Sequence, residues 1–225
     1  MNKAMKLTQD QILQIETYLN FKELTHLDLQ NEVLDHMATD IEKHIRHGSN
    51  FKQAFKNVIS DWNHELSEHS SWFIGWVWTG PRILIDKGVK KTKQIYLRTL
   101  LATLAVAMTI HLIHNTLIDI EPSKFLNLMV GSAYIVIFFL ILLFFWRIKA
   151  TDYQSTYSFL FKINAIGFAF MYLAFNPILL DRTMIFGKEE TYYWALLFHS
   201  FLFSFAYSFW DLYKSHFSSK KLVLS

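Results

Sequence analysis

The second half of this 225-residue chain contains four long stretches without any Asp, Glu, Lys or Arg. These stretches are residues 99–118, 125–146, 163–180 and 191–210. A helix of about 20 apolar residues crosses the roughly 30 Å hydrocarbon layer of a bilayer. Because no water inside that layer can satisfy backbone N–H and C=O groups, each stretch is expected to be helical. The sequence therefore predicts an all-α integral membrane protein with four spans.

The distribution of charge argues against nucleic acid as a partner. Residues 1–70 hold seven Lys and Arg side chains against eleven Asp and Glu side chains, so this segment is acidic. A nucleic-acid-binding domain normally presents a basic face instead. The excess positive charge lies directly before the first apolar stretch, at Lys87, Lys90, Lys91, Lys93 and Arg98. Such a position is typical of a cytoplasmic flank that contacts anionic lipid, so the expected partner is the bilayer.

Lys and Arg placement also predicts the orientation of the spans. With four spans, residues 1–98, the connection 147–162 and the tail from residue 214 lie on one side, which carries 19 Lys and Arg residues against 3 on the other. Basic residues favour the cytoplasmic side, so both termini are expected in the cytoplasm of a bacterial inner membrane. The start of the chain has no apolar signal-peptide core, which agrees with a cytoplasmic N-terminal segment.

Four divisions follow from these patterns: a soluble helical domain at 1–70, a Trp-rich interfacial and basic connector at 71–98, a four-span transmembrane bundle at 99–213 and a cytoplasmic tail at 214–225. In the soluble domain, Thr8 begins a capping box, Thr25 is a candidate cap for a second helix, Gly48 is a stop signal and Asn50 starts a third helix. A small all-α cytoplasmic domain before a membrane bundle is the expected architecture.

The Trp-rich segment 71–81 is too short and too interrupted to cross a membrane. Trp72, Trp76 and Trp78 suit the headgroup zone, where an apolar ring that carries a polar N–H is at home. The same rings could instead cap the core of the soluble domain. The sequence leaves both interpretations open.

The predicted helices of the soluble domain share one set of residues: a Tyr-Leu pair, a Glu and a His four residues apart, and a Gly followed by Ser and Ala. They are Tyr18, Leu19, Glu32, His36, Gly48, Ser49 and Ala54. In these residues the segment resembles the HAAS-type helical signalling domain. Domains of this kind pair with PadR-type transcription regulators and often precede several membrane helices. The resemblance covers about residues 8–68 and implies a membrane-bound regulatory or signalling protein.

One polar stripe on the second predicted helix is a candidate site. Glu32, His36, Asp40 and His44 follow one another at intervals of four residues and so share a helix face. His and carboxylate side chains at this spacing can bind a divalent metal ion. An exposed face of Glu–His and Asp–His pairs is the more frequent reason for such a stripe, and contact of Glu32, His36 and Asp40 with a protein partner is the other alternative.

Histidines inside the apolar stretches form a second candidate site. His111 and His114 lie on one face of the first span, and His199 lies at a similar predicted depth in the fourth. Imidazoles at one depth can hydrogen-bond to each other, share a proton or bind a metal ion or haem. Polar contacts that hold helices together are the more common role of such residues in lipid. We therefore expect no cofactor from these three histidines.

Two features of the middle spans bear on packing. The Phe-rich half of the second span, residues 138–145, is expected to face lipid or a partner subunit. In the third span, the small or polar residues Gly167, Ala169 and Asn164 are expected to allow close helix packing. Pro177 is expected to end or kink the helix.

No cysteine is present, which excludes thiolate chemistry, and no phosphate-binding loop or catalytic triad is recognisable. The sequence thus predicts a non-enzymatic regulatory or accessory protein whose cytoplasmic domain binds a protein partner. A structural subunit of a larger transport or secretion complex is the first alternative. A haem-binding or metal-binding redox protein is the second.

Overall fold

The computed structural model describes the backbone of residues 6–75, 77–116, 124–179 and 189–223, and the side chains within 6–75, 77–113, 128–179 and 194–220. This part of the chain is helical apart from one short hairpin, so the all-α prediction is confirmed. The elements are α1 (Gln9–Phe21), α2 (Leu27–Arg46), α3 (Phe51–Trp62), β1 (Glu68–Ser70), β2 (Thr79–Pro81), α4 (Arg82–Thr116), α5 (Lys124–Lys149), α6 (Thr156–Ala174) and α7 (Glu189–Val223).

Local signals account for most of the boundaries in the N-terminal segment. The Thr8 side chain accepts from the Gln11 backbone N–H and the Gln11 side chain accepts from the Thr8 N–H, which confirms the capping box of α1. Asn50 caps α3, and Gly48 takes a positive φ of 96° just after α2. The prediction for Thr25 is wrong: the residue before α2 is His26, whose side chain makes no capping bond.

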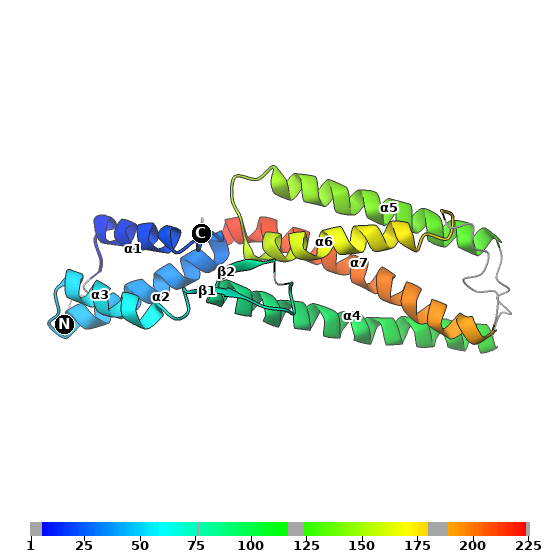
Figure 1. Ribbon diagram of the computed structural model, residues 1–225, viewed down its shortest axis with the longest axis horizontal. Helices are drawn as coiled ribbons and strands as arrows, with labels where there is room; N and C mark the ends of the chain where they lie inside the picture. The colour runs from blue at the N-terminus through cyan, green and yellow to red at the C-terminus, as the bar shows by residue number, and fades with distance from the viewer. Residues whose placement is uncertain (1–5, 76, 117–123, 180–188, 224–225) are drawn as a thin grey trace. The chain divides into compact units, whose positions relative to one another are not determined.

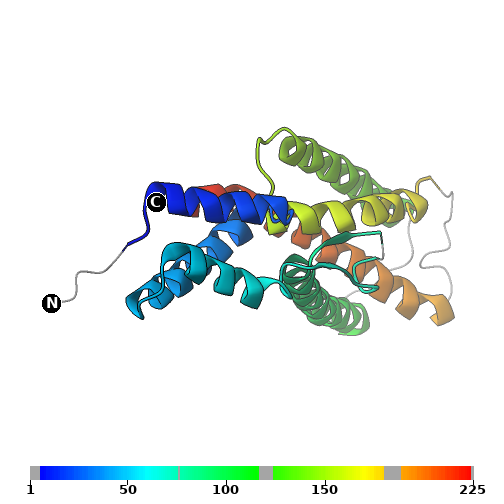
Figure 2. The same ribbon diagram turned by 60° about the vertical axis from the view of Figure 1, so that its left-hand side comes forward.

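The three N-terminal helices form one core, because α2 packs against both α1 and α3 (Figures 1 and 2). A fully buried apolar stripe on α2 faces inward at the spacing of a helix face. Its members are Leu29, Val33, Met37 and Ile41. Burial of this stripe, rather than the intrinsic propensity of α2, holds the helix in place.

After α3 the chain forms a hairpin that was not predicted. Strands β1 and β2 pair antiparallel, with His69 opposite Gly80. The base of the hairpin is closed by hydrogen bonds from the Arg82 and Ile83 N–H groups to the carbonyls of Ser67 and Glu65. Three-residue strands are too short to show an alternating pattern, which explains why the sequence did not reveal them.

The chain divides into two compact units that do not follow sequence order. The first unit contains Met1–Lys91 together with Asp152–Thr156 and His216–Ser225. The second contains Thr92–Thr151 and Tyr157–Ser215. The connection between α5 and α6 and the end of α7 thus belong to the same unit as α1, α2 and α3.

The second unit is a bundle in which α4, α5, α6 and α7 run alongside one another (Figure 1). Its core is largely aromatic: Phe168 stacks on Phe205 with ring centroids 3.6 Å apart, and Phe161 meets Phe209 edge-on. Fully buried Tyr134 and Tyr172 complete this layer. Large rings fill the space between helices with few rotatable bonds, which stabilises the packing.

Three described helices are long and apolar enough to cross a membrane: Arg82–Ile113, Leu128–Lys149 and Thr156–Ala174. They correspond to the first three predicted spans, so the expectation of a membrane protein gains support. The fourth predicted span falls within α7, which is not among the three. Along its described length α7 mixes Ser, Tyr, His199 and Asp211 with its Phe and Leu residues.

Close packing between α5 and the end of α6 is achieved by a different glycine from the predicted one. A Cβ at Gly131 would lie 2.5 Å from Ile178 Cγ1, whereas a Cβ at Gly167 would meet nothing within 4 Å. The packing prediction for α6 is therefore wrong for Gly167, which lies on an exposed face, and confirmed for Asn164, which is buried, and Ala169, which packs against the core. The prediction for Pro177 is confirmed, since α6 ends at Ala174.

Candidate functional site

The polar stripe of α2 lies on the exposed side of the N-terminal unit. Glu32 forms an ion pair with Lys87 of α4, with 2.5 Å between Oε2 and Nζ. The His36 ring stacks on Trp62 of α3, with centroids 6.5 Å apart. Asp40 is exposed, and His44 is half-buried. The stripe thus presents two acidic groups, Glu32 and Asp40, and the His36 imidazole to solvent.

The metal hypothesis for this stripe finds no geometric support in the described residues. Throughout that part of the chain, no three His, Asp or Glu side chains gather in a way that could hold a metal ion. Glu32 and His36 point to different neighbours, Lys87 and Trp62.

A second group of polar residues surrounds the connection between α5 and α6. We call it the loop junction and define it as residues 152–156 with Leu27 and Asp28 of α2 and His216 and Lys220 of α7. The Leu27 N–H donates to the Gln154 carbonyl over 2.9 Å, and the Thr156 N–H donates to Asp28 Oδ1 over 2.8 Å. The first N–H groups of a helix lack intrahelical acceptors, so Asp28 satisfies the start of α6 from a distant part of the chain.

His216 lies at the centre of the loop junction and is fully buried. Its Nδ1 shares a hydrogen bond of 2.8 Å with Ser155 Oγ, and its ring stacks on Tyr153 with centroids 4.6 Å apart. The Tyr153 hydroxyl donates to the His216 carbonyl. Ser155 is also fully buried, so the Ser–His contact has no access for a substrate and is a structural contact.

An exposed ion pair closes the loop junction at its edge. Lys220 Nζ lies 3.2 Å from Asp152 Oδ1 and 5.1 Å from the centroid of the Tyr153 ring. The hydrogen bond from Lys220 holds the pKa of the Asp152 carboxyl below its ordinary value. Burial, with a smaller contribution from the Asp152 charge, raises the pKa of the Tyr153 hydroxyl. Tyr153 therefore stays neutral and keeps its donor proton.

The bundle contains a buried polar cluster built around one of the predicted histidines. His199 Nδ1 forms a short hydrogen bond with the hydroxyl of Tyr134, which joins α7 to α5. The Tyr172 hydroxyl of α6 donates to the Leu202 carbonyl over 2.6 Å. The Tyr134 and Tyr172 rings meet edge-on at 5.3 Å. Three helices are thus tied together by groups that would be costly to leave unpaired in lipid.

The predicted grouping of His111, His114 and His199 has a mixed outcome. His199 is buried, and His111 is partly exposed on α4. The side chain of His114 lies outside the described residues. His199 is hydrogen-bonded to Tyr134 of another helix. This is the polar contact between helices that the sequence analysis gave as the more common role of such histidines.

Several residues that organise these sites were missed at the sequence level: Asp28, Tyr134, Tyr153, Ser155 and His216. Their partners lie between 61 and 128 residues away in the chain. The available signal was a polar residue in an apolar run, as for Tyr134, or an acidic residue in the first turn of a helix, as for Asp28.

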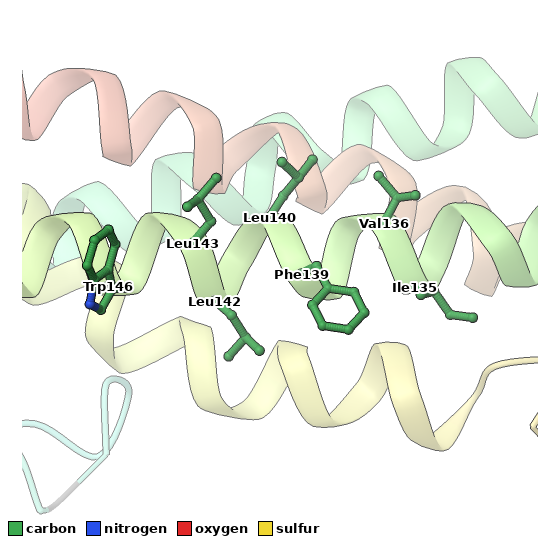
Figure 3. Close-up of a pocket in the computed structure, with 7 residues that line it drawn as sticks. All are labelled: Ile135, Val136, Phe139, Leu140, Leu142, Leu143 and Trp146. Atoms are coloured by element: carbon green, nitrogen blue, oxygen red, sulfur yellow. The ribbon is translucent and has the colours of Figure 1, made fainter.

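The outer face of α5 is apolar and open. Ile135, Val136, Phe139, Leu140, Leu142, Leu143 and Trp146 line a shallow depression along it (Figure 3). The opposite face carries the buried residues Tyr134, Ile141 and Ile148. The Phe-rich half of the second predicted span thus divides between packing inside the bundle and an exposed apolar surface.

Comparison with known protein families, curated proteins and solved structures finds no match to this chain. The chemistry of its own residues therefore carries the functional argument.

Proposed function

We propose that this chain is a multi-pass regulatory or accessory protein of a bacterial inner membrane, with its N-terminal helical segment in the cytoplasm and bound to a protein partner. The observation that carries the proposal is the position of α2. This helix presents exposed Glu32, His36 and Asp40, and its first turn is hydrogen-bonded to the connection that begins α6.

That arrangement gives the partner-binding helix a direct connection to a helix that is apolar enough to cross a membrane. Asp28 in the first turn of α2 holds the Thr156 N–H at the start of α6. A partner that shifts α2 changes this hydrogen bond, and a change in α6 alters α2 in return, because coupling between two sites is reciprocal. A regulatory protein requires such a connection between its soluble and membrane segments.

The HAAS-type resemblance supports the same proposal and suggests the class of partner. Glu32 and His36, two of the residues that carry the resemblance, are exposed on α2. A PadR-type transcription regulator is therefore the first partner to test. An adjacent gene for such a regulator would support regulation, whereas an adjacent permease or ATPase gene would favour the subunit alternative.

Charge reversal on the exposed face of α2 tests the partner site. We expect the full chain, purified from its native membrane in mild detergent, to carry a stoichiometric protein partner that Asp40→Lys removes. Asp61→Lys on α3 is the matched control, since Asp61 is exposed and outside the polar stripe. Equal recovery of the partner with both variants, or a clean chain with no interactor, would contradict the proposal.

The open apolar face of α5 favours one alternative function, a structural subunit of a larger membrane complex. A partner subunit would bury Phe139, which is 61% exposed. A photoreactive residue at position 139 should then yield protein adducts in native membranes. Adducts with lipid alone would reject the subunit alternative and leave the regulatory proposal intact.

A further inference from the structure

The β1–β2 hairpin ends in a tip that exposes large apolar side chains to solvent. Trp72 is 76% exposed and Val77 is 90% exposed. Exposed apolar groups at a loop tip cost free energy unless something covers them, and they often mark an interaction site. The tip is therefore a candidate interaction surface.

The tip is built to hold these two side chains in place. The Phe73 N–H donates to Ser71 Oγ, and the Trp78 N–H donates to the Gly75 carbonyl. Gly75 takes a φ of 97°, a conformation open to glycine at little cost. Between the exposed residues, Ile74 is buried and anchors the tip to the unit. Trp72 and Val77 are thus presented by a defined turn.

Cationic side chains follow the hairpin directly. The first ten residues of α4 carry Arg82, Lys87, Lys90 and Lys91 against a single acidic residue, Asp86. Lys90 is exposed. Lysines beside an anionic bilayer surface are attracted to the lipid headgroups. A Trp ring with cationic neighbours is the combination that suits the headgroup zone.

The hairpin is attached to the start of a helix that continues into a candidate membrane span. Its base is closed by hydrogen bonds from the Arg82 and Ile83 N–H groups at the beginning of α4. This helix runs without a break from Arg82 to Thr116, and Arg82–Ile113 is apolar enough to cross a membrane. The exposed tip and the cationic first turns of α4 therefore belong to the segment of the chain that directly precedes the charge-free stretch beginning at residue 99.

We propose that the β1–β2 hairpin inserts Trp72 and Val77 into the headgroup layer of an anionic bilayer, with Lys90 close to the lipid phosphates. The contact fixes the N-terminal unit against the membrane surface. It is independent of the protein partner proposed above. It also separates the two sequence-level interpretations of the Trp-rich segment, because a ring that capped the soluble core would not be exposed as Trp72 is.

Site-directed spin labelling of the full chain tests this contact. The natural sequence contains no cysteine, so Val77→Cys gives a single labelling site. Leu13→Cys on α1, where Leu13 is 58% exposed, is the control. In nanodiscs that contain phosphatidylglycerol, the label at position 77 should collide several-fold less with a water-soluble nickel complex than the label at position 13. It should also collide more with oxygen, which partitions into lipid.

Two further measurements make the result decisive. Quenching of Trp fluorescence by brominated lipid should fall in Trp72→Phe relative to the natural chain, and this readout needs no label. Adding Lys90→Glu to the position-77 label should restore part of its collision with nickel. Equal accessibility of positions 77 and 13, with unchanged quenching in Trp72→Phe, would overturn the proposal. Unchanged immersion in Lys90→Glu would overturn the role given to Lys90.

Discussion

Asp28 and Thr156 are 128 residues apart in the chain, and the carboxylate of the first accepts the backbone N–H of the second over 2.8 Å. The acidic residue belongs to the first turn of α2, and the acceptor it provides serves the first turn of α6. A single side chain thus completes the start of a helix that it does not belong to. This relationship makes α2 and the beginning of α6 parts of one compact unit.

Removing this carboxylate should weaken the unit. Asp28→Ala leaves the Thr156 N–H without its acceptor, and loss of a capping side chain costs about 1 kcal/mol. Unfolding of the detergent-solubilised chain by denaturant, followed by circular dichroism, measures the change. Asp35→Ala is the control, because Asp35 is exposed on the same helix. Equal stability of the two variants would show that the cap contributes nothing.

The ion pair at the edge of the loop junction predicts a pH dependence. Because Lys220 holds the pKa of Asp152 below its ordinary value of 3.8, this carboxylate stabilises the fold above that value. The contribution is lost as the pH falls through the lowered pKa of the folded state. Asp152→Asn should therefore reduce the thermal midpoint slightly near neutral pH, and the difference from the natural chain should vanish in acid.

Salt and a second variant check the origin of that effect. Asp152 is 82% exposed, so added salt should screen the pair and shrink the difference at neutral pH. Asp61→Asn, on the exposed side of α3, should show no such convergence with pH. A difference between Asp152→Asn and the natural chain that persists unchanged in acid would rule out this ion pair as its cause.

Two glycines in the bundle should respond to alanine in opposite directions. At Gly131 a methyl group would overlap Ile178 and Asn176 Oδ1, and Asn176 Nδ2 already donates to the Gly131 carbonyl over 3.0 Å. Overpacking of this kind costs about 1–3 kcal/mol. At Gly167 the methyl group meets open space, and alanine improves helix stability by up to about 1 kcal/mol. The two variants are compared by their resistance to unfolding in mixed micelles. Destabilisation by Gly167→Ala would contradict the open space found beside Gly167.

The hydrogen bond between Tyr134 and His199 should contribute measurably to the bundle. Tyr134→Phe keeps the ring and removes the hydroxyl, which should cost about 0.6–2 kcal/mol, the range for polar contacts between helices in lipid. Tyr207→Phe is the matched control, since Tyr207 is 58% exposed. A double-mutant cycle with His199→Phe isolates the pair, and a coupling energy of zero would exclude an energetic role for this bond.

The sequence predicted the helices of this protein better than their ends. The criterion of charge-free residues placed the start of the first span at residue 99, but the helix α4 begins at Arg82. The reason is that charged residues end the apolar stretch but do not end the helix, which continues outside the lipid. Capping signals at Thr8 and Asn50 were sharper guides, because they act through bonds within three residues.

The candidate site was predictable only where it depends on one helix. The stripe of Glu32, His36 and Asp40 follows from the period of α2, and its exposure agrees with the polar pattern. The loop junction could not be predicted, because His216 and Ser155 meet through the return of α7 to the N-terminal unit. A local sequence pattern does not predict a contact between residues that are 61 positions apart in the chain.

The most direct test of the whole account is the labelling of single cysteines in sealed spheroplasts with a membrane-impermeant maleimide. Lys52→Cys, exposed on α3, represents the N-terminal unit, and Ser123→Cys represents the predicted external connection after the first span. We expect the reagent to modify position 123 in intact spheroplasts and position 52 only after the membrane is permeabilised. Modification of position 52 from outside, or recovery of the intact chain in the soluble fraction without detergent, would contradict a membrane protein with a cytoplasmic helical segment.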